Sequence, residues 1–214
     1  AVSAWLTRWP AGRFDPAGGR YCYSDLAFAR GLADGPGAAP PTPGTVHWPE
    51  EYGDPDRYAV YGSEAEVTRR INIVLIPDGY TYADKATLEA HAQEFVAAFR
   101  SKAPFKQHDP FVNYILVYAY SSESGTDQCD CSTVRDTAMN TRFPHLNPSC
   151  GHSDNRCLFY GSGNGGPDCD PNVSTSNIAA AELRAPARDA TIILVNTGRY
   201  GGCGGARAVY SAGY

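Results

Sequence analysis

Cysteines and histidines are the residue types in this chain whose spacing could form a metal site. Six of the seven cysteines lie from Cys129 onward. Zinc binds thiolate and imidazole ligands, and structural zinc sites usually separate paired ligands by two to four residues. Here a single residue separates Cys129 from Cys131, and a single residue separates Cys150 from His152. We therefore expect disulfides at these positions, and with them an oxidising, extracellular location.

Aspartates in the same half of the chain offer oxygen ligands among glycines. Calcium is coordinated by such oxygens, but their spacing does not follow the EF-hand loop. We expect solvated turn residues, which aspartate favours, and keep a calcium site as the alternative. The residues concerned are Asp127, Asp130, Asp154, Asp168 and Asp170.

The patterns of other enzyme classes are absent or incomplete. Gly161–Gly166 satisfies GxGxxG, but Pro167 follows where a phosphate-binding loop needs the start of a helix, so we expect a flexible loop. The chain has no GxSxG elbow and no HExxH pair. Each histidine is expected to lie at the surface or to be hydrogen-bonded, namely His47, His91, His108, His145 and His152. The residues alone therefore show no catalytic constellation.

Apolar patterning predicts one strand–turn–helix unit as the centre of the fold. The run Ile71–Ile76 predicts a buried strand, and Pro77-Asp78-Gly79 ends it. Thr81 and Asp84 match a capping box, which marks a helix start. The helix is predicted over residues 84–100, because four apolar residues share one face. They are Leu88, Ala92, Phe95 and Phe99.

Further strands are predicted over residues 113–120, 189–196 and 206–212, with another between 58 and 67. A short helix is expected over residues 177–183, and Thr126–Pro186 reads as a long disulfide-rich insertion. This order predicts an α/β fold with a mixed sheet and a right-handed crossover helix. We expect two parts, a β-rich or extended segment over residues 1–69 and the main domain over 70–214.

Charge and hydropathy exclude two classes of partner. The formal net charge is −5, without the clustered basic surface that nucleic-acid binding requires. No apolar run approaches the roughly 20 residues that a membrane-spanning helix needs. We expect neither nucleic-acid binding nor a membrane span.

Several segments, taken in order, resemble the IgA-specific metallopeptidase family of secreted zinc endopeptidases. They are IVLIPDGYT (73–81), EFVAAFRSKAPF (94–105), FVNYILVYAYSSESGTD (111–127), RDTAMNT (135–141) and ATIILVNTGRYGGCGG (190–205). The resemblance spans roughly Arg70 to Tyr214. It implies a zincin-like fold, a protein or peptide substrate and hydrolysis by zinc-activated water.

The HExxH segment of that family is expected just downstream of Tyr200-Gly201-Gly202, beyond Tyr214. The resemblance thus places the zinc ligands outside residues 1–214, in the remainder of the same polypeptide or in a second chain. Cys203 could pair with a residue beyond Tyr214, which would account for the odd cysteine count. Without a following helix, we expect the strand faces at Ile192, Leu194 and Val209 to be exposed.

The resemblance further implies that the strand at 206–212 is the sheet edge beside the cleft, able to bind an extended peptide. We expect the substrate cleft to be lined by Tyr200, Gly201, Gly202, Val209 and Tyr210, and the alternative is a glycine-rich turn on an ordinary core strand. Asp78 and Asp127 are expected to hold turns at strand ends.

The leading hypothesis for function is a secreted zinc metalloendopeptidase whose metal site lies outside this segment. The alternative is a non-catalytic, disulfide-stabilised secreted module with a binding or structural role. Zinc content separates the two, because only the enzyme requires the metal.

Overall fold

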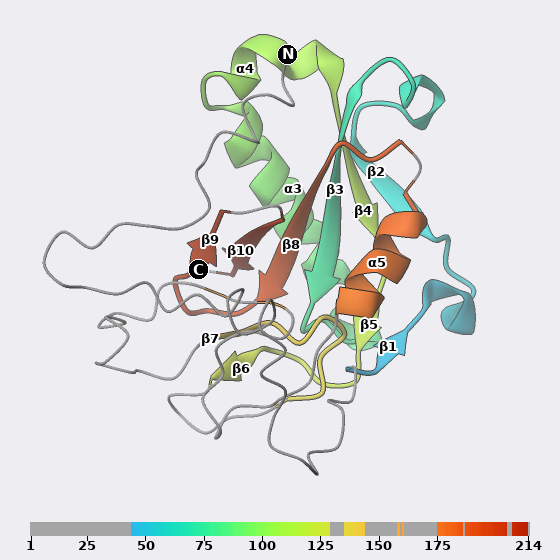
Figure 1. The fold of residues 1–214 in the computed structure, drawn as a ribbon, viewed down its shortest axis with the longest axis vertical. Helices are drawn as coiled ribbons and strands as arrows, with labels where there is room; N and C mark the ends of the chain where they lie inside the picture. The colour runs from blue at the N-terminus through green and yellow to red at the C-terminus, as the bar shows by residue number, and fades with distance from the viewer. Residues whose placement is uncertain are drawn as a thin grey trace, which may run out of the picture.

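The computed structural model describes residues 44–128, 135–143, 158, 160, 175–185, 187–204 and 207–213. Its centre is a six-stranded sheet in the order β2-β4-β3-β8-β10-β9 (Figure 1). The strands are β2 (Arg57–Tyr61), β3 (Ile71–Asp78), β4 (Val112–Val117), β8 (Ala190–Asn196), β9 (Gly202–Cys203) and β10 (Ala208–Ala212). The four inner strands are parallel, whereas β2 and β9 run antiparallel to their neighbours. The predicted α/β class with a mixed sheet is confirmed, and its zincin-like character stays a prediction.

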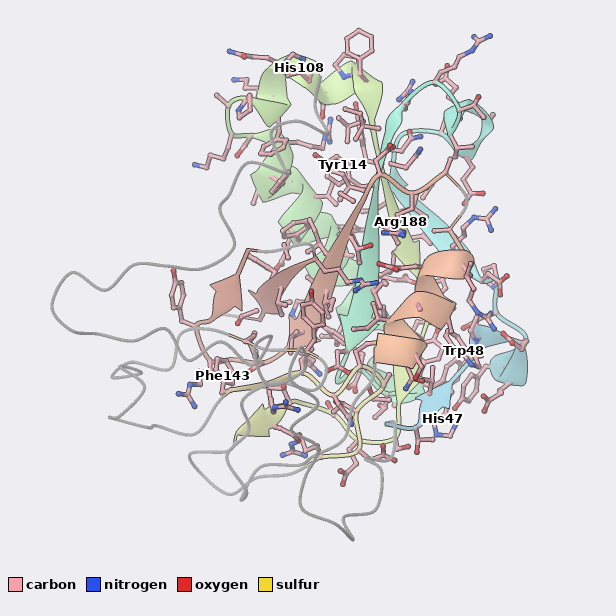
Figure 2. All side chains as sticks on the ribbon, viewed as in Figure 1. His47, Trp48, His108, Tyr114, Phe143 and Arg188 are labelled. Atoms are coloured by element: carbon pink, nitrogen blue, oxygen red, sulfur yellow. The ribbon has the colours of Figure 1, made fainter. Side chains whose placement is uncertain are left out.

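Two short strand pairs flank the main sheet. In the first, β1 (Val46–His47) pairs antiparallel with β5 (Tyr120–Ser121), beside the His47 and Trp48 side chains (Figure 2). In the second, β6 (Asp127–Gln128) pairs parallel with β7 (Arg142–Phe143). Because β1 and β2 both pair with strands of the main domain, residues 44–61 pack on that domain. The division of the chain at residue 69 stays a prediction.

The central strand β3 forms where the apolar run predicted it. Every residue from Asn72 to Asp78 is buried, because β4 and β8 pair with both edges and helices cover both faces. Ile73 and Leu75 belong to the core on one face, and Val74 and Ile76 to the core on the other. This alternation is the period of two that a strand imposes on its side chains.

Helix α3 (Lys85–Arg100) forms the crossover between β3 and its parallel neighbour β4. The predicted cap is confirmed: the Thr81 N–H donates to Asp84 Oδ2 at 2.9 Å, at the start of the 3₁₀ turn Tyr82–Asp84 that leads into the helix. The predicted apolar face packs on the Ile73–Leu75 face of the sheet, with Phe99 partly buried. The handedness of the crossover stays a prediction.

The remaining helical segments are short. Helix α5 (Thr175–Leu183) confirms the predicted short helix, and its Ile178 and Ala181 cover the Val74–Ile76 face. α4 (Phe105–His108) and three further 3₁₀ turns lie in the connections, at Pro49–Tyr52, Glu64–Glu66 and Asp109–Phe111. Within the ranges given above, no helix is long and apolar enough to span a bilayer.

The expectation of exposed strand faces near the end of the chain is wrong. Ile192, Leu194 and Val209 are 7%, 0% and 5% exposed. Ile192 and Leu194 lie in the core on the α3 face, and Val209 lies in the core on the α5 face. Helices that precede these strands in the sequence therefore bury them.

Several predictions fall outside the described residues. The disulfide framework, the Gly161–Gly166 loop and the aspartates from Asp130 to Asp170 lie there. The side chain of Cys203 is likewise not described, although its backbone forms part of β9.

Candidate functional site

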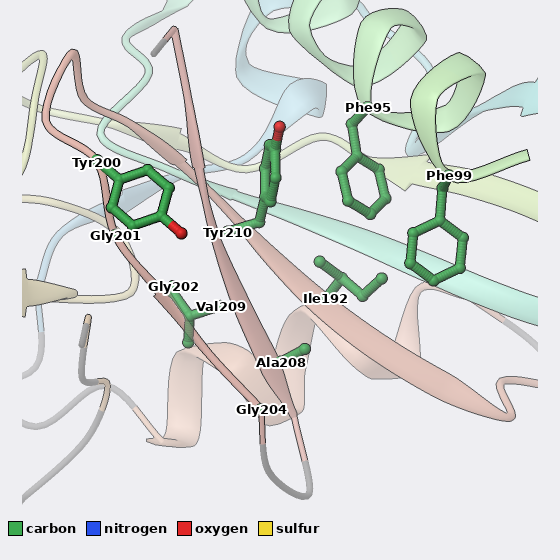
Figure 3. Close-up of a pocket in the computed structure, with 10 residues that line it drawn as sticks. All are labelled: Phe95, Phe99, Ile192, Tyr200, Gly201, Gly202, Gly204, Ala208, Val209 and Tyr210. Carbon is green, nitrogen blue, oxygen red and sulfur yellow. The ribbon is translucent and has the colours of Figure 1, made fainter. Parts of the chain in front are cut away.

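The five residues predicted to line a cleft meet around one cavity of about 350 Å³ (Figure 3). Tyr200, Gly201 and Gly202 form one wall, and Val209 and Tyr210 of β10 lie beside them. Phe95 and Phe99 of α3 and Ile192 of β8 line the same cavity, which we call the hollow. That the hollow binds substrate stays a prediction.

A tight chain reversal builds the glycine wall. After β8 the chain turns back, so that Gly202 lies opposite Tyr210 and Cys203 opposite Val209. The Ser211 N–H also donates to the Gly201 carbonyl oxygen at 3.3 Å. A Cβ atom on Gly202 would lie 2.9 Å from the Val209 carbonyl oxygen, closer than carbon and oxygen normally approach. Only glycine fits this position without a shift of the backbone.

This reversal corrects the predicted sheet edge. The predicted strand is β10 (Ala208–Ala212), and β9 lies outside it, so among the described strands the edge is β9. Sequence reasoning missed β9 because Gly202-Cys203 is too short to show a strand period, and its pairing depends on the preceding turn. The edge strand therefore includes Gly202, and Tyr200 and Gly201 directly precede it. All three residues lie closer to the sheet edge than the prediction placed them.

Aromatic rings form the floor of the hollow. The ring of Tyr210 lies 4.8 Å from that of Phe95, and Phe95 lies 5.4 Å from Phe99, all between centroids. Tyr210 and Tyr200 remain 40% and 57% exposed, and the lining residues carry no charged side chain. Helical periodicity had placed Phe95 and Phe99 on the buried face of α3, but it could not show that they meet Tyr210.

Asp78 confirms its predicted structural role at the end of β3. Its fully buried carboxylate accepts hydrogen bonds from the N–H groups of Met139 and Thr141, at 2.7 and 2.8 Å. The hydroxyls of Thr137 and Thr141 donate to the same carboxylate. Burial raises the pKa of Asp78, and these hydrogen bonds act in the opposite direction. The carboxylate thereby holds residues 137–141 against the sheet.

Asp127 has a similar role nearby. It is buried, and its Oδ1 accepts the N–H of Arg135 at 2.6 Å. This bond fastens the segment beginning at Arg135 to β6, as predicted for a turn-holding residue. The other four aspartates of the calcium hypothesis lie outside the described residues, so that hypothesis stays untested.

An ion pair that sequence reasoning missed supports β10 from the α5 side. Arg207 donates from Nε and Nη2 to the two oxygens of Glu182, at 2.7 and 2.8 Å. Glu182 is 7% exposed and also accepts the Thr191 hydroxyl. The Arg207 hydrogen bonds lower the pKa of Glu182, while burial opposes the shift. The pair fixes the residue at which the chain enters β10.

The part of the chain that the structure describes does not fit a zinc ion. Within it, no three histidine, cysteine, aspartate or glutamate side chains gather as a metal site requires. We therefore derive no chemical step through zinc from these residues.

Comparison with known proteins gives one positive finding. Residues 62–155 match the family model described as IgA Peptidase M64. A search of curated proteins gives no match. The matched range contains β3, α3, β4 and the Asp78 contacts, whereas the glycine wall and β10 lie beyond it. The match supports a peptidase-related function, and the resemblance to the IgA peptidase family is confirmed over residues 62–155.

Proposed function

We propose that this chain supplies the substrate-binding edge of a secreted zinc metalloendopeptidase, which hydrolyses peptide bonds in protein substrates. One observation carries the proposal: the five residues predicted for the cleft line a single apolar hollow next to an edge strand. The family match over residues 62–155 supports the peptidase class. The zinc ligands belong, in this proposal, to polypeptide outside residues 1–214.

In this proposal, the edge strand β9 is where the backbone of the peptide pairs. Among the described strands, β9 pairs with β10 on one side only. An extended peptide can add to such an edge through its own N–H and C=O groups, which gives affinity independent of sequence. Tyr200 and Gly201 lead into this strand and Gly202 begins it, and the glycines offer no side chain that would hold a peptide away.

In this proposal, the hollow determines which side chains of the peptide bind best. In an extended peptide, alternate side chains point to the same face of the sheet. A peptide added to β9 would direct every second side chain toward the α3 face, where Phe95, Ile192 and Tyr210 line the hollow. An apolar lining favours leucine or aromatic side chains and disfavours charged ones, because a buried charge without a partner is costly.

Calorimetric titration with two short extended peptides tests this proposal. One peptide carries leucine at alternate positions, and the matched control carries aspartate at the same positions. We expect the leucine peptide to bind and the aspartate peptide to bind at least about tenfold more weakly. Equal binding of both peptides, or of neither, would contradict the proposed hollow.

A matched pair of glycine variants tests the edge. Gly202→Ala places a methyl group against the Val209 carbonyl and should weaken peptide binding by disturbing β9. Gly198→Ala lies in the same chain reversal, where its methyl group meets only the Gly213 carbonyl oxygen at an ordinary 3.9 Å. We expect this control to bind like the unmodified chain, and equal loss in both variants would refute the role of β9.

Metal analysis of the secreted, full-length polypeptide tests the catalytic part. The enzyme requires about one zinc per polypeptide and proteolysis that a chelator abolishes. Peptide binding without zinc or proteolysis would support the peptide-binding role of β9 and contradict the enzymatic activity.

A further inference from the structure

The side chains of His47, Ser122 and Glu51 meet beside the β1–β5 pair. This strand pair lies apart from β9 (Figure 1), and His47 is labelled in Figure 2. The His47 Nε2 atom lies 3.2 Å from the Ser122 hydroxyl oxygen. The His47 Nδ1 atom lies 3.1 Å from Glu51 Oε2. A nucleophile, a base and an acid that orients the base are the components of a serine-hydrolase triad, which is recognised by geometry and not by position in the sequence.

The carboxylate determines which way the hydrogen bonds run. An ionised carboxylate can only accept, so the bond to Glu51 requires the proton of neutral His47 on Nδ1. The Nε2 atom then carries a lone pair directed at the Ser122 hydroxyl. His47 is thereby poised to receive the hydroxyl proton.

The backbone holds all three residues in place. His47 lies opposite Tyr120 in the β1–β5 pair, and Ser122 directly follows β5. Glu51 belongs to the 3₁₀ turn Pro49–Tyr52, and its other oxygen, Oε1, accepts the Trp48 N–H at 2.8 Å. The orienting acid is therefore itself fixed. Ser122 is exposed, so a small acyl compound can reach it.

Two carboxylates near His47 and Ser122 have opposite effects on proton transfer from the Ser122 hydroxyl to His47. The hydrogen bond from His47, followed by that from the Trp48 N–H, lowers the pKa of Glu51, which keeps the carboxylate ionised. A second carboxylate, that of Asp136, also interacts with Ser122. Burial raises the pKa of Asp136, but hydrogen bonds from Thr45 and Ser122 lower it overall. Asp136 and His47 therefore compete for the single hydroxyl proton.

We propose that Ser122, His47 and Glu51 form an acyl-transfer site that hydrolyses small activated esters, independent of the peptide edge. The Ser122 oxygen attacks the acyl carbon, and its proton passes to His47 Nε2. The bond from the acyl carbon to the leaving alcohol oxygen breaks, and His47 returns the proton to that oxygen. Water then hydrolyses the serine ester, which releases the carboxylic acid and restores the hydroxyl.

Acetylation by p-nitrophenyl acetate, followed by peptide mass spectrometry of the full chain, tests the site. We expect the acetyl group on Ser122, and loss of that label in Ser122→Ala. His47→Gln should slow acetylation of Ser122 about 100-fold, at the lower end of general-base contributions. Glu51→Gln, which keeps the size of the side chain, should slow it as well.

Ser124→Ala is the matched control, because Ser124 is an exposed serine of the same loop that bonds to Asn196 and not to His47. We expect this variant to acetylate Ser122 at the unmodified rate. Three results would each overturn the proposal. They are no label on Ser122 together with p-nitrophenyl acetate hydrolysis no faster than in Ser122→Ala, equal labelling of Ser122 and Ser124 in the unmodified chain, or a rate unchanged by His47→Gln. Far-ultraviolet circular dichroism of every variant separates loss of the site from loss of the fold.

Discussion

The end of β3 and the edge strand β9 differ in how far contacts within the chain already satisfy their polar groups and cover their apolar groups. At the end of β3, the buried carboxylate of Asp78 receives hydrogen bonds from three residues of one loop, so both of its oxygens already have donors within the chain. At β9, the lining of the hollow is apolar, and its two tyrosines, Tyr200 and Tyr210, stay partly exposed. A buried polar group whose hydrogen bonds are all made within the protein stabilises the fold. An exposed apolar surface, by contrast, is stabilised when a ligand covers it. We therefore regard the first region as structural and propose that the second serves recognition.

The largest expected loss of stability comes from removing the Asp78 carboxylate at the end of β3. Asp78→Ala leaves two buried N–H groups and two hydroxyls without their acceptor. We expect the free energy of unfolding to fall by about 3–5 kcal/mol, measured by urea denaturation. Glu94→Ala, an exposed change on α3, should stay within about 0.5 kcal/mol. A similar small effect for both would show that Asp78 does not hold the loop.

A pH titration of stability examines the support beneath β10. The ordinary pKa of Glu182 is 4.5, and Arg207 lowers it in the folded chain. As the pH falls, the unfolded chain therefore binds this proton first. The contribution of Glu182 is complete above pH 4.5 and is lost as the pH drops through the lower, folded pKa. We expect the stability difference between the unmodified chain and Glu182→Gln to shrink over that range, and a constant difference would contradict the assignment.

The smallest expected change in stability comes from the hollow. Tyr210→Ala removes a partly exposed ring from its contact with Phe95 and should cost about 1 kcal/mol, the scale of an aromatic pair. The same variant should weaken binding of the leucine peptide, because the floor of the hollow is lost. Tyr210→Phe keeps the ring and should bind like the unmodified chain. A stability loss without weaker binding would place Tyr210 with the structural residues.

Local patterns predicted the parts of this fold that local patterns determine. The β-branched run of β3, the Thr81–Asp84 cap and the apolar face of α3 each follow from neighbouring residues. The edge strand β9 has no such signal, because two residues cannot show a period and their pairing depends on a chain reversal. The coverage of Ile192 and Val209 was missed because it depends on how preceding helices pack.

Contacts between distant segments also could not be predicted from local patterns. The partners of Asp78 lie about sixty residues further along the chain, and Ser122 lies 75 residues from His47. The five cleft residues, which lie around one glycine-rich turn, are grouped by the resemblance to the peptidase family and not by local periodicity. The α3 side of their cavity could not be predicted, since helical periodicity identifies a buried face without identifying what it meets.

Hydrogen exchange of the β9 and β10 amides, with and without the leucine peptide, tests the central claim most directly. The account predicts that the peptide slows exchange at Gly202 to Gly204, because its backbone would pair with the outer side of β9. Gly202→Ala should abolish this protection, and Gly198→Ala should keep it. Protection confined to other strands, or none at saturating peptide, would contradict the assignment of β9 and the hollow as the peptide-binding edge.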